Sequence, residues 1–267
     1  MNAILAIDAA WTASQPSGVA LVKQGPACWE CVAVAPSYDS FVGIGNGTPV
    51  NWNARKSPRG SQPDPAKLLD VAHRLLGSTR VSLVTVDLPV ATIPIADRRV
   101  ADNSLSRAFG QNGCGTHSPN SDRPGLVGIA LKDGFAGNGF PIAAADCPVG
   151  TPHRLVEVYP HPALLRLLNV TFRVCYKVSK RRDYWQGCMN PRRKRYLLKS
   201  FRNILDALKD NIASIDVPLP RPGLSFAFLK RFEDALDALI CAWVGIMYLA
   251  GRAQPYGDNT AAIWNPL

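Results

Sequence analysis

Long apolar runs are missing from this sequence. The longest, residues 238–251 (ALICAWVGIMYLAG), is too short to span a bilayer and predicts a buried helix instead. The amino terminus has no basic segment ahead of its first apolar run, so we expect no secretory signal peptide. The seven cysteines show no disulfide-framework spacing, which favours a reducing compartment. We therefore expect a cytoplasmic protein.

Acidic residues are nearly missing from one stretch, residues 173–202. Eleven Lys or Arg stand there against a single acid, Asp183, so this basic window carries a formal charge of +10, which equals that of the whole chain. Tyrosines and a tryptophan are interleaved with the basic residues, a pattern that favours contact with the phosphates and bases of nucleic acid. A solvated helical face is the alternative. The residues predicted to bind nucleic acid are Lys177, Lys180, Arg181, Arg182, Arg192, Arg193, Lys194 and Arg195.

Two apolar runs each stop on an aspartate. Residues 3–7 (AILAI) precede Asp8, and residues 81–86 (VSLVTV) precede Asp87. Continuous apolar runs of this length predict strands buried on both faces, in the middle of a sheet that helices cover. Open α/β sheets bind their ligands beyond the carboxyl ends of such strands. Because adjacent strands lie about 4.8 Å apart, two carboxylates at neighbouring strand ends can share a cation.

The rest of the chain predicts further strands, several helices and long loops. Glu157 falls inside an apolar strand, where a solitary carboxylate is costly to bury. Asp64 and Pro65 carry the signals of a helix start. The predicted strands are residues 18–22, 27–35 and 154–159, the last being the final strand of the chain. The predicted helices are residues 64–77, 101–109, 126–136, 163–168, 191–209 and 225–249. The predicted loop excursions are residues 36–63 and 92–152, the second of which contains two of these helices.

The final helix carries three acids, Glu233, Asp234 and Asp237, and no charge from there to residue 251. Asp234 and Asp237 are three residues apart and so share one helix face. A buried pair of carboxylates needs a basic partner, a helix start or metal ions. Exposure of this first part of the helix to solvent is the alternative.

Carboxylates placed in this way permit phosphodiester chemistry. Two divalent ions about 3.5–4 Å apart can activate water and stabilise the leaving oxygen. Hard oxygen ligands favour Mg²⁺ or Mn²⁺ over zinc. A zinc site built from Cys114, His117, Cys147 and His153 is disfavoured, because these residues are irregularly spaced.

Six segments carry a family resemblance that spans nearly the whole chain: AIDAAWTASQPSGVALV, VTVDLPVA, DRRVADNSLSRAFGQNGCGTHSPN, VEVYPHPALLRLL, EDALDALICAW and AIWNP. The chain resembles the RNase H-like superfamily. More closely, it is similar to the family called domain of unknown function 429, whose members are described as predicted nucleases of RNase H fold. The loop at residues 36–63 and the basic window match this family less tightly.

The resemblance implies roles for particular acids. Asp8, Asp87 and Asp237 would be the catalytic residues and metal ligands, with Asp234 beside them and Glu157 as a further ligand. The resolvase branch of the superfamily has a similar Asp-Ala-Leu element on its last helix, which residues 237–239 match.

We therefore expect one α/β domain over residues 1–267, with an RNase H-like mixed sheet, its first three strands an antiparallel meander, and helices on both faces. The predicted function is a nuclease that depends on Mg²⁺ or Mn²⁺. The alternative is a non-catalytic nucleic-acid-binding protein that keeps the fold. A small-molecule phosphotransferase of the actin-like kinase type needs a second similar domain with its own Asp-Gly phosphate turn, and the sequence shows no such repeat.

Overall fold

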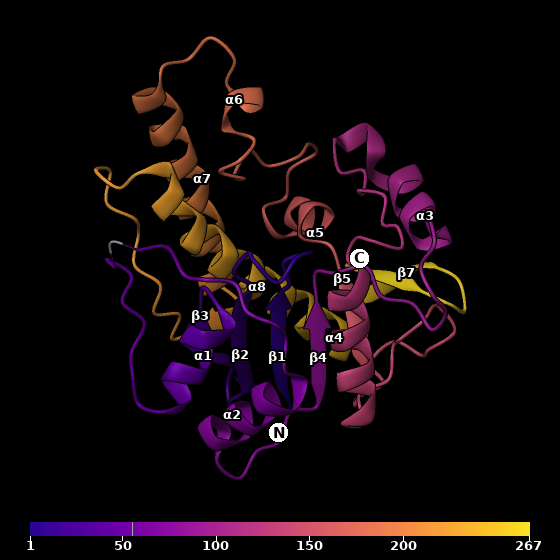
Figure 1. Cartoon of the computed structure of the whole chain (residues 1–267). Coiled ribbons are helices and arrows are strands. Elements are labelled where there is room, and N and C mark those ends of the chain that lie inside the picture. The colour runs from indigo at the N-terminus through magenta and orange to yellow at the C-terminus, as the bar shows by residue number, and fades with distance from the viewer. Residues whose placement is uncertain (55) are drawn as a thin grey trace.

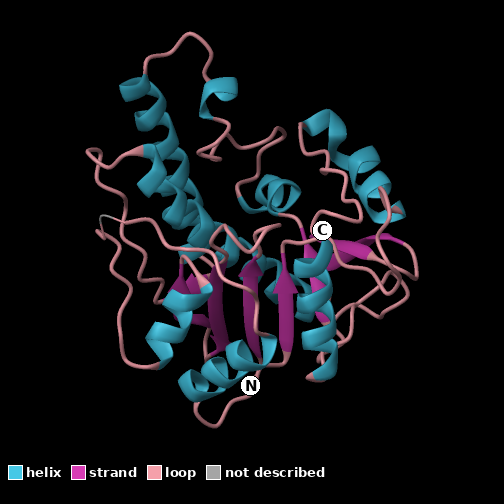
Figure 2. Cartoon of the chain, in the orientation of Figure 1, coloured by secondary structure: helices cyan, strands magenta, loops and turns pink. Residues whose placement is uncertain are grey.

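The computed structural model describes residues 1–54 and 56–267, which form an α/β fold around one mixed sheet (Figures 1 and 2). The strand order in that sheet is β6-β3-β2-β1-β4-β5-β8-β7. The strands are β1 (Ala3–Asp8), β2 (Gly18–Gln24), β3 (Trp29–Ala35), β4 (Leu83–Val86), β5 (Leu155–Val158), β6 (Ile212–Ala213), β7 (Ala253–Gly257) and β8 (Ala262–Pro266). The expected α/β class with a mixed sheet is confirmed.

The first three strands form the predicted meander, because β1 pairs antiparallel with β2 and β2 antiparallel with β3. The other side of β1 pairs in parallel with β4, and β5 and β8 continue the parallel part of the sheet. The short β6 joins β3 in parallel, and β7 closes the far edge antiparallel to β8. Strands β1 and β4 therefore lie side by side and end at the same edge (Figure 1).

Helices pack on both faces of this sheet. The described helices are α1 (Tyr38–Gly45), α2 (Pro65–Leu76), α3 (Val100–Phe109), α4 (Gly125–Gly137), α5 (Pro160–Leu167), α6 (Arg181–Tyr184), α7 (Asn190–Lys209) and α8 (Phe226–Leu249), with a 3₁₀ turn, η1, at Gly110–Asn112. The short α6 packs against α7. The predicted start of α2 is confirmed, since the Asp64 side chain accepts a hydrogen bond from the Lys67 amide. No helix of the described residues is both long and apolar enough to cross a membrane.

Alternation along the strands divides the core into two layers. Ile4 and Ala6 of β1 pack in one apolar cluster with residues of α5, α7 and α8. Leu5 and Ile7 pack in the opposite cluster with residues of α1, α2 and α4. Continued by one residue, the same alternation places the side chain of Asp8 on the face that α8 covers.

Helix α8 approaches the sheet closely at two glycines. A Cβ added at Gly18 of β2 would lie 2.0 Å from the backbone oxygen of Asp234. One added at Gly245 of α8 would lie 2.8 Å from the Thr85 Cγ2 atom. The missing side chain at Gly18 therefore allows α8 to reach the strand ends, and Gly18 is itself paired with Asp8 in the sheet.

Two sequence expectations about the fold were wrong. Residues 36–63 contain α1, whose Ser37 cap accepts a hydrogen bond from the Ser40 amide. Residues 154–159 are not the last strand, because β6, β7 and β8 follow. Helix α1 was missed because it has two glycines in eight residues. Strand β6 has only two residues, and β7 and β8 each contain a proline, which argues against a strand. Arg55, inside the predicted loop, lies outside the described residues.

We expect Gly18→Ala to lower the free energy of unfolding by about 2 kcal/mol or more, because overpacking of this kind costs about 1–3 kcal/mol and the clashing atom belongs to rigid helix backbone. Urea denaturation measures the change. Gly137→Ala is the matched control, because an added Cβ there meets nothing within 4 Å. Equal stabilities of the two variants would contradict the close approach of α8.

Candidate carboxylate site

Asp8 and Asp87 lie next to each other at the carboxyl ends of β1 and β4. Ile7 is the register partner of Val86, and the Asp87 amide donates a hydrogen bond of 2.9 Å to the Ile7 carbonyl. Thr85 meets α8 at Gly245, so alternation along β4 places the Asp87 side chain on the α8 face as well. The two strand-end acids predicted from the sequence are therefore brought together.

The three acids of α8 are buried against the same edge, so the solvent-exposed alternative is wrong. Glu233 is 2% exposed, Asp234 1% and Asp237 0%. Asp237 accepts a 2.5 Å hydrogen bond from the Tyr176 hydroxyl and forms a 2.5 Å ion pair with the Lys177 ammonium. These contacts join the chain before α6 to the centre of α8.

A second lysine, Lys230, sits one turn before these acids. Its ammonium lies 3.1 Å from Glu233 and also pairs with Asp234. Lys177 approaches Glu233 more distantly, at 3.8 Å. Sequence reasoning missed Lys230, although its spacing of three and four residues from the two acids is the helical signal for an ion pair. No local pattern marks Tyr176 or Lys177 as partners of Asp237, because they come from a distant segment.

Negative charge exceeds positive charge in this carboxylate cluster, which we define as Asp8, Asp87, Glu233, Asp234 and Asp237. The ammonium groups of Lys177 and Lys230 pair with the three α8 acids, and none of the described ion pairs includes Asp8 or Asp87. This excess of negative charge contributes to raised pKa values of acids in the cluster.

Burial, together with the nearby Asp237 carboxylate, raises the pKa of Asp8 to about 7. Burial and the Asp8 carboxylate raise the pKa of Asp87 well above its usual range. Burial also raises the pKa of Asp234, which keeps one oxygen, Oδ2, without a hydrogen-bond partner among the described residues. These acids therefore hold protons at a pH where exposed carboxyls are ionised.

The cluster offers hard oxygen donors but is arranged here around lysines. Within residues 1–54 and 56–267, no group of three or more His, Cys, Asp or Glu side chains has the geometry to hold a metal ion. For the acids of α8 the described contacts explain this absence, because Lys177 and Lys230 form ion pairs with carboxylate oxygens of Asp237 and Asp234. The unpartnered Asp234 oxygen and the raised pKa of the Asp8 carboxyl fit a site that gains stability from an added cation.

Glu157, the further ligand implied by the resemblance, is not brought to this cluster. It follows Leu155 by two residues on β5 and thus points to the face opposite α8. There both of its oxygens accept hydrogen bonds of 2.6 Å from the Arg99 guanidinium, which also binds Asp102. The Val90 amide donates a further bond to Glu157. This carboxylate is fully engaged in a buried ion pair that ties β5 to the start of α3.

The basic window divides into two parts. Lys177 belongs to the carboxylate cluster, where it neutralises Asp237. The other predicted residues lie on or next to α6 and the amino-terminal part of α7, which extend away from the sheet in Figure 1. Of these, the exposed ones are Lys180, Arg182, Arg192 and Arg195, and the half-buried ones are Arg181, Arg193 and Lys194. Arg181 and Lys194 lie over the Phe226 ring at 4.3 and 5.5 Å, and Arg192 and Arg195 lie over Tyr196 at 5.5 and 5.9 Å.

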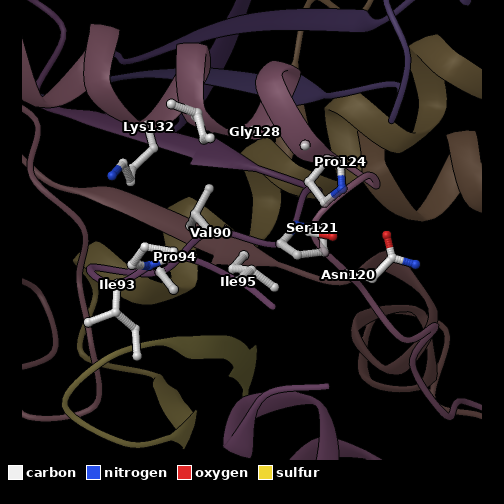
Figure 3. Close-up of a pocket in the computed structure, with 13 residues that line it drawn as sticks. Val90, Ile93, Pro94, Ile95, Asn120, Ser121, Pro124, Gly128 and Lys132 are labelled. Carbon is white, nitrogen blue, oxygen red and sulfur yellow. The ribbon is translucent and has the colours of Figure 1, made fainter. Parts of the chain in front are cut away.

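Two cavities lie near the segment that follows β4. One of about 140 Å³ is lined by Asp87, Lys177 and His161, and so borders the carboxylate cluster. The other, of about 370 Å³, lies between α4 and residues 89–95 (Figure 3). Its lining is mostly apolar, and Lys132 is its one ionisable residue among those described. The chemistry of acid and base groups therefore belongs to the smaller cavity.

Residues 29–261 match the family model described as "Protein of unknown function (DUF429)". The chain belongs to this family. The match includes Asp87, Asp234 and Asp237, whereas Asp8 precedes it. No curated protein and no solved structure matches the chain. The family description supplies no activity, so the function of this DUF429 member must be argued from its own residues.

The crowding of acids in this DUF429 protein predicts how its stability depends on pH. An acid whose pKa is raised from 3.8 unfolded to about 7 folded stabilises the protein below pH 4, and that stability is lost as the pH rises through 7. In EDTA we expect the free energy of unfolding of the wild type to fall over this range relative to Asp8→Asn. The difference is on the order of 4 kcal/mol at pH 8. Denaturant unfolding at a series of pH values measures this difference. If the free energy of unfolding depends on pH in the same way in both proteins, the raised pKa of Asp8 is refuted.

Glu157→Gln tests the separation of Glu157 from the cluster. Leaving Arg99 with only part of its buried counter-charge should cost about 3 kcal/mol of unfolding free energy. Binding of Mn²⁺, measured by calorimetry, should be unchanged, because the cluster is intact. Normal stability combined with lost Mn²⁺ binding would instead place Glu157 among the metal ligands.

Proposed function

We propose that this chain is a nuclease of RNase H-like fold that hydrolyses phosphodiester bonds with divalent metal ions. The observation that carries the proposal is the convergence of Asp8, Asp87, Asp234 and Asp237 at one edge of the sheet, with more negative charge than Lys177 and Lys230 neutralise. Burying more carboxylates than there are cations to pair with them lowers the stability of the folded protein. Such an excess suits a site that binds added cations.

The strand arrangement supports the fold part of the proposal. An antiparallel meander, β1 to β3, continues through β1 into the parallel strands β4 and β5. The acids stand at the end of the first strand, at the end of the neighbouring parallel strand, and on the last long helix. This is the layout that the family resemblance implies for an RNase H-like nuclease.

The residues divide the proposed work as follows. Asp8 and Asp87 would hold one Mg²⁺ or Mn²⁺ between them, Asp237 would hold a second, and Asp234 would complete the ligand set. A bound pair of such ions supplies activation of water and stabilisation of the leaving oxygen. To hold these ions, Asp8 and Asp87 would have to lose their protons, and Lys177 would have to move away from Asp237. Lys177 would then be free to contact a phosphate oxygen of the substrate.

The exposed part of the basic window would hold the nucleic acid. Lys180, Arg182, Arg192 and Arg195 are exposed on or beside α6 and α7, with the Tyr196 ring among them. A positive surface with aromatic rings binds the phosphates and bases of a single strand. The same surface supports the alternative of a non-catalytic nucleic-acid-binding protein, so the two functions must be separated by their dependence on metal.

Asp8→Asn and Asp87→Asn should each abolish Mn²⁺-dependent cleavage of single- and double-stranded DNA and RNA substrates. We expect a loss greater than the roughly 10–100-fold that follows removal of an outer-shell group at a metal site. Gel-based cleavage assays with Mn²⁺, Mg²⁺ or EDTA measure it. Asp133→Asn, on the exposed side of α4, is the control and should keep wild-type activity.

Retained cleavage in both strand-end variants would rule out the proposed mechanism. Salt-dependent binding of nucleic acid by the wild type, without cleavage or any effect of Mg²⁺, would favour the non-catalytic alternative.

A further inference from the structure

A small cavity beside the carboxylate cluster has the properties of an anion site. Its volume is about 140 Å³, below the roughly 300–1,000 Å³ of sites for whole small molecules, so it fits a chemical group instead. Asp87 and Lys177 line it on the side of the cluster. Tyr159, Pro160 and His161 line it with the amino-terminal end of α5, which has no side-chain cap. The helix dipole adds partial positive charge there.

His161, which lines this cavity, has an unused hydrogen-bond donor. The residue is 4% exposed, and its Nε2 atom lies 2.7 Å from Nη2 of Arg173. A guanidinium only donates, so Nε2 must accept, and the proton of the neutral imidazole stands on Nδ1. Nδ1 is buried and has no partner among the described residues. A buried N–H without an acceptor is costly, which makes an acceptor from a ligand the natural partner.

The charges around His161 favour an anion over a neutral acceptor. Burial and the nearby Lys177 and Arg173 lower the pKa of His161 well below 6.5, so the imidazole is neutral and surrounded by cations. Burial and Arg173 also lower the pKa of His117, which lines the same cavity. Two further acids in the lining, Asp102 and Glu157, are already paired with Arg99. Asp87 is then the acid that the proposed metal ion would neutralise.

We propose that this cavity binds a phosphoryl group of the substrate, with the His161 Nδ1–H and the Lys177 ammonium donating to its oxygens. The proposal rests on the proposed function for its substrate class, and it makes His161 a positioning residue for the phosphate next to Asp87. His161 forms edge-to-face contacts with Tyr176, whose hydroxyl binds Asp237. The phosphate donor and the α8 acids are therefore held by one packed unit.

The remainder of the ligand would lie in an adjoining cavity of about 560 Å³. Trp11 and His117 line both cavities, so the two cavities are neighbours at these side chains. Arg123 lines the larger one, with its guanidinium 5.9 Å from the centre of the Trp11 ring. An aromatic ring beside a cation suits a nucleobase. The pair of cavities thus fits one nucleotide unit, with its phosphate innermost.

Calorimetric titration of inorganic phosphate into the full-length protein, with Mg²⁺ and separately with EDTA, tests the site. His161→Gln keeps an acceptor at the Nε2 position for Arg173 but removes the Nδ1 donor. We expect it to weaken phosphate binding about 10- to 100-fold, the effect of one hydrogen bond to a charged group. His161→Asn places an amide donor near the Nδ1 position and should retain more of the affinity. His73→Gln, on α2, is the matched control.

Histidine-labelled wild-type protein supplies a test that needs no variant. The ¹⁵N spectrum should show His161 protonated at Nδ1, with its Nδ1 resonance shifting on addition of phosphate. An Nε2-protonated tautomer, or no shift at saturating phosphate, would overturn the proposal. So would wild-type phosphate affinity in His161→Gln.

Two further titrations separate the sources of the phosphoryl group. Adenosine 5′-monophosphate should bind more tightly than phosphate, and Trp11→Ala should remove only that gain. A single-stranded oligonucleotide that competes with phosphate identifies a polymer as the ligand, whereas an oligonucleotide that does not compete identifies a free phosphate or nucleotide.

Mn²⁺ titration of the same proteins separates this inference from the proposed function. Normal Mn²⁺ binding, together with a phosphate affinity that His161→Gln leaves unchanged, would contradict this inference but not the proposed function. Phosphate binding that requires His161 in a protein that binds no Mn²⁺ would support the inference while removing the metal mechanism.

Discussion

Unbalanced charge at one edge of the sheet is the constraint on which this structure depends. Five carboxylates meet two ammonium groups where β1, β4 and α8 come together. In a low-dielectric site, neighbouring carboxyl groups cannot all be ionised at once. The protein therefore either keeps protons on Asp8 and Asp87 or takes up cations. The lysines hold the α8 acids in place meanwhile. The excess of carboxylates thus lowers the stability of the metal-free protein and at the same time supplies the ligands of the proposed metal site.

The apolar packing forces this arrangement. Helix α8 is buried along nearly its whole length, and Gly18 lets its backbone come within reach of β2. The helix cannot move away from the sheet without exposing that apolar surface, at a cost of about 25 cal/mol per Å². Hydrophobic burial of α8 therefore keeps Asp234 and Asp237 against the strand ends, and their ion pairs with Lys230 and Lys177 add to it.

Much of this was predictable from sequence because two physical signals are local. Apolar runs ending on Asp8 and Asp87 predicted the central strands, and the next two strand patterns along the chain predicted the meander. Period-two alternation also decides the faces: counted from buried neighbours, Asp8 and Asp87 point toward α8, whereas Glu157 points away. Its inclusion by resemblance ignored that alternation. The roles of Lys177, Tyr176 and His161 were not predictable, because each depends on contacts between segments far apart in the chain. Strand β6 has only two residues, and β7 and β8 each contain a proline, which is atypical of a strand.

Calorimetric titration of Mn²⁺ at pH 7, in two buffers of different ionisation enthalpy, tests the central claim most directly. If the crowded acids keep protons that a cation replaces, the wild type should bind Mn²⁺ and release protons, so the measured heat will depend on the buffer. Asp87→Asn should bind far more weakly. A wild type that binds no Mn²⁺, or that binds it without releasing protons and as tightly as Asp87→Asn does, would contradict the account.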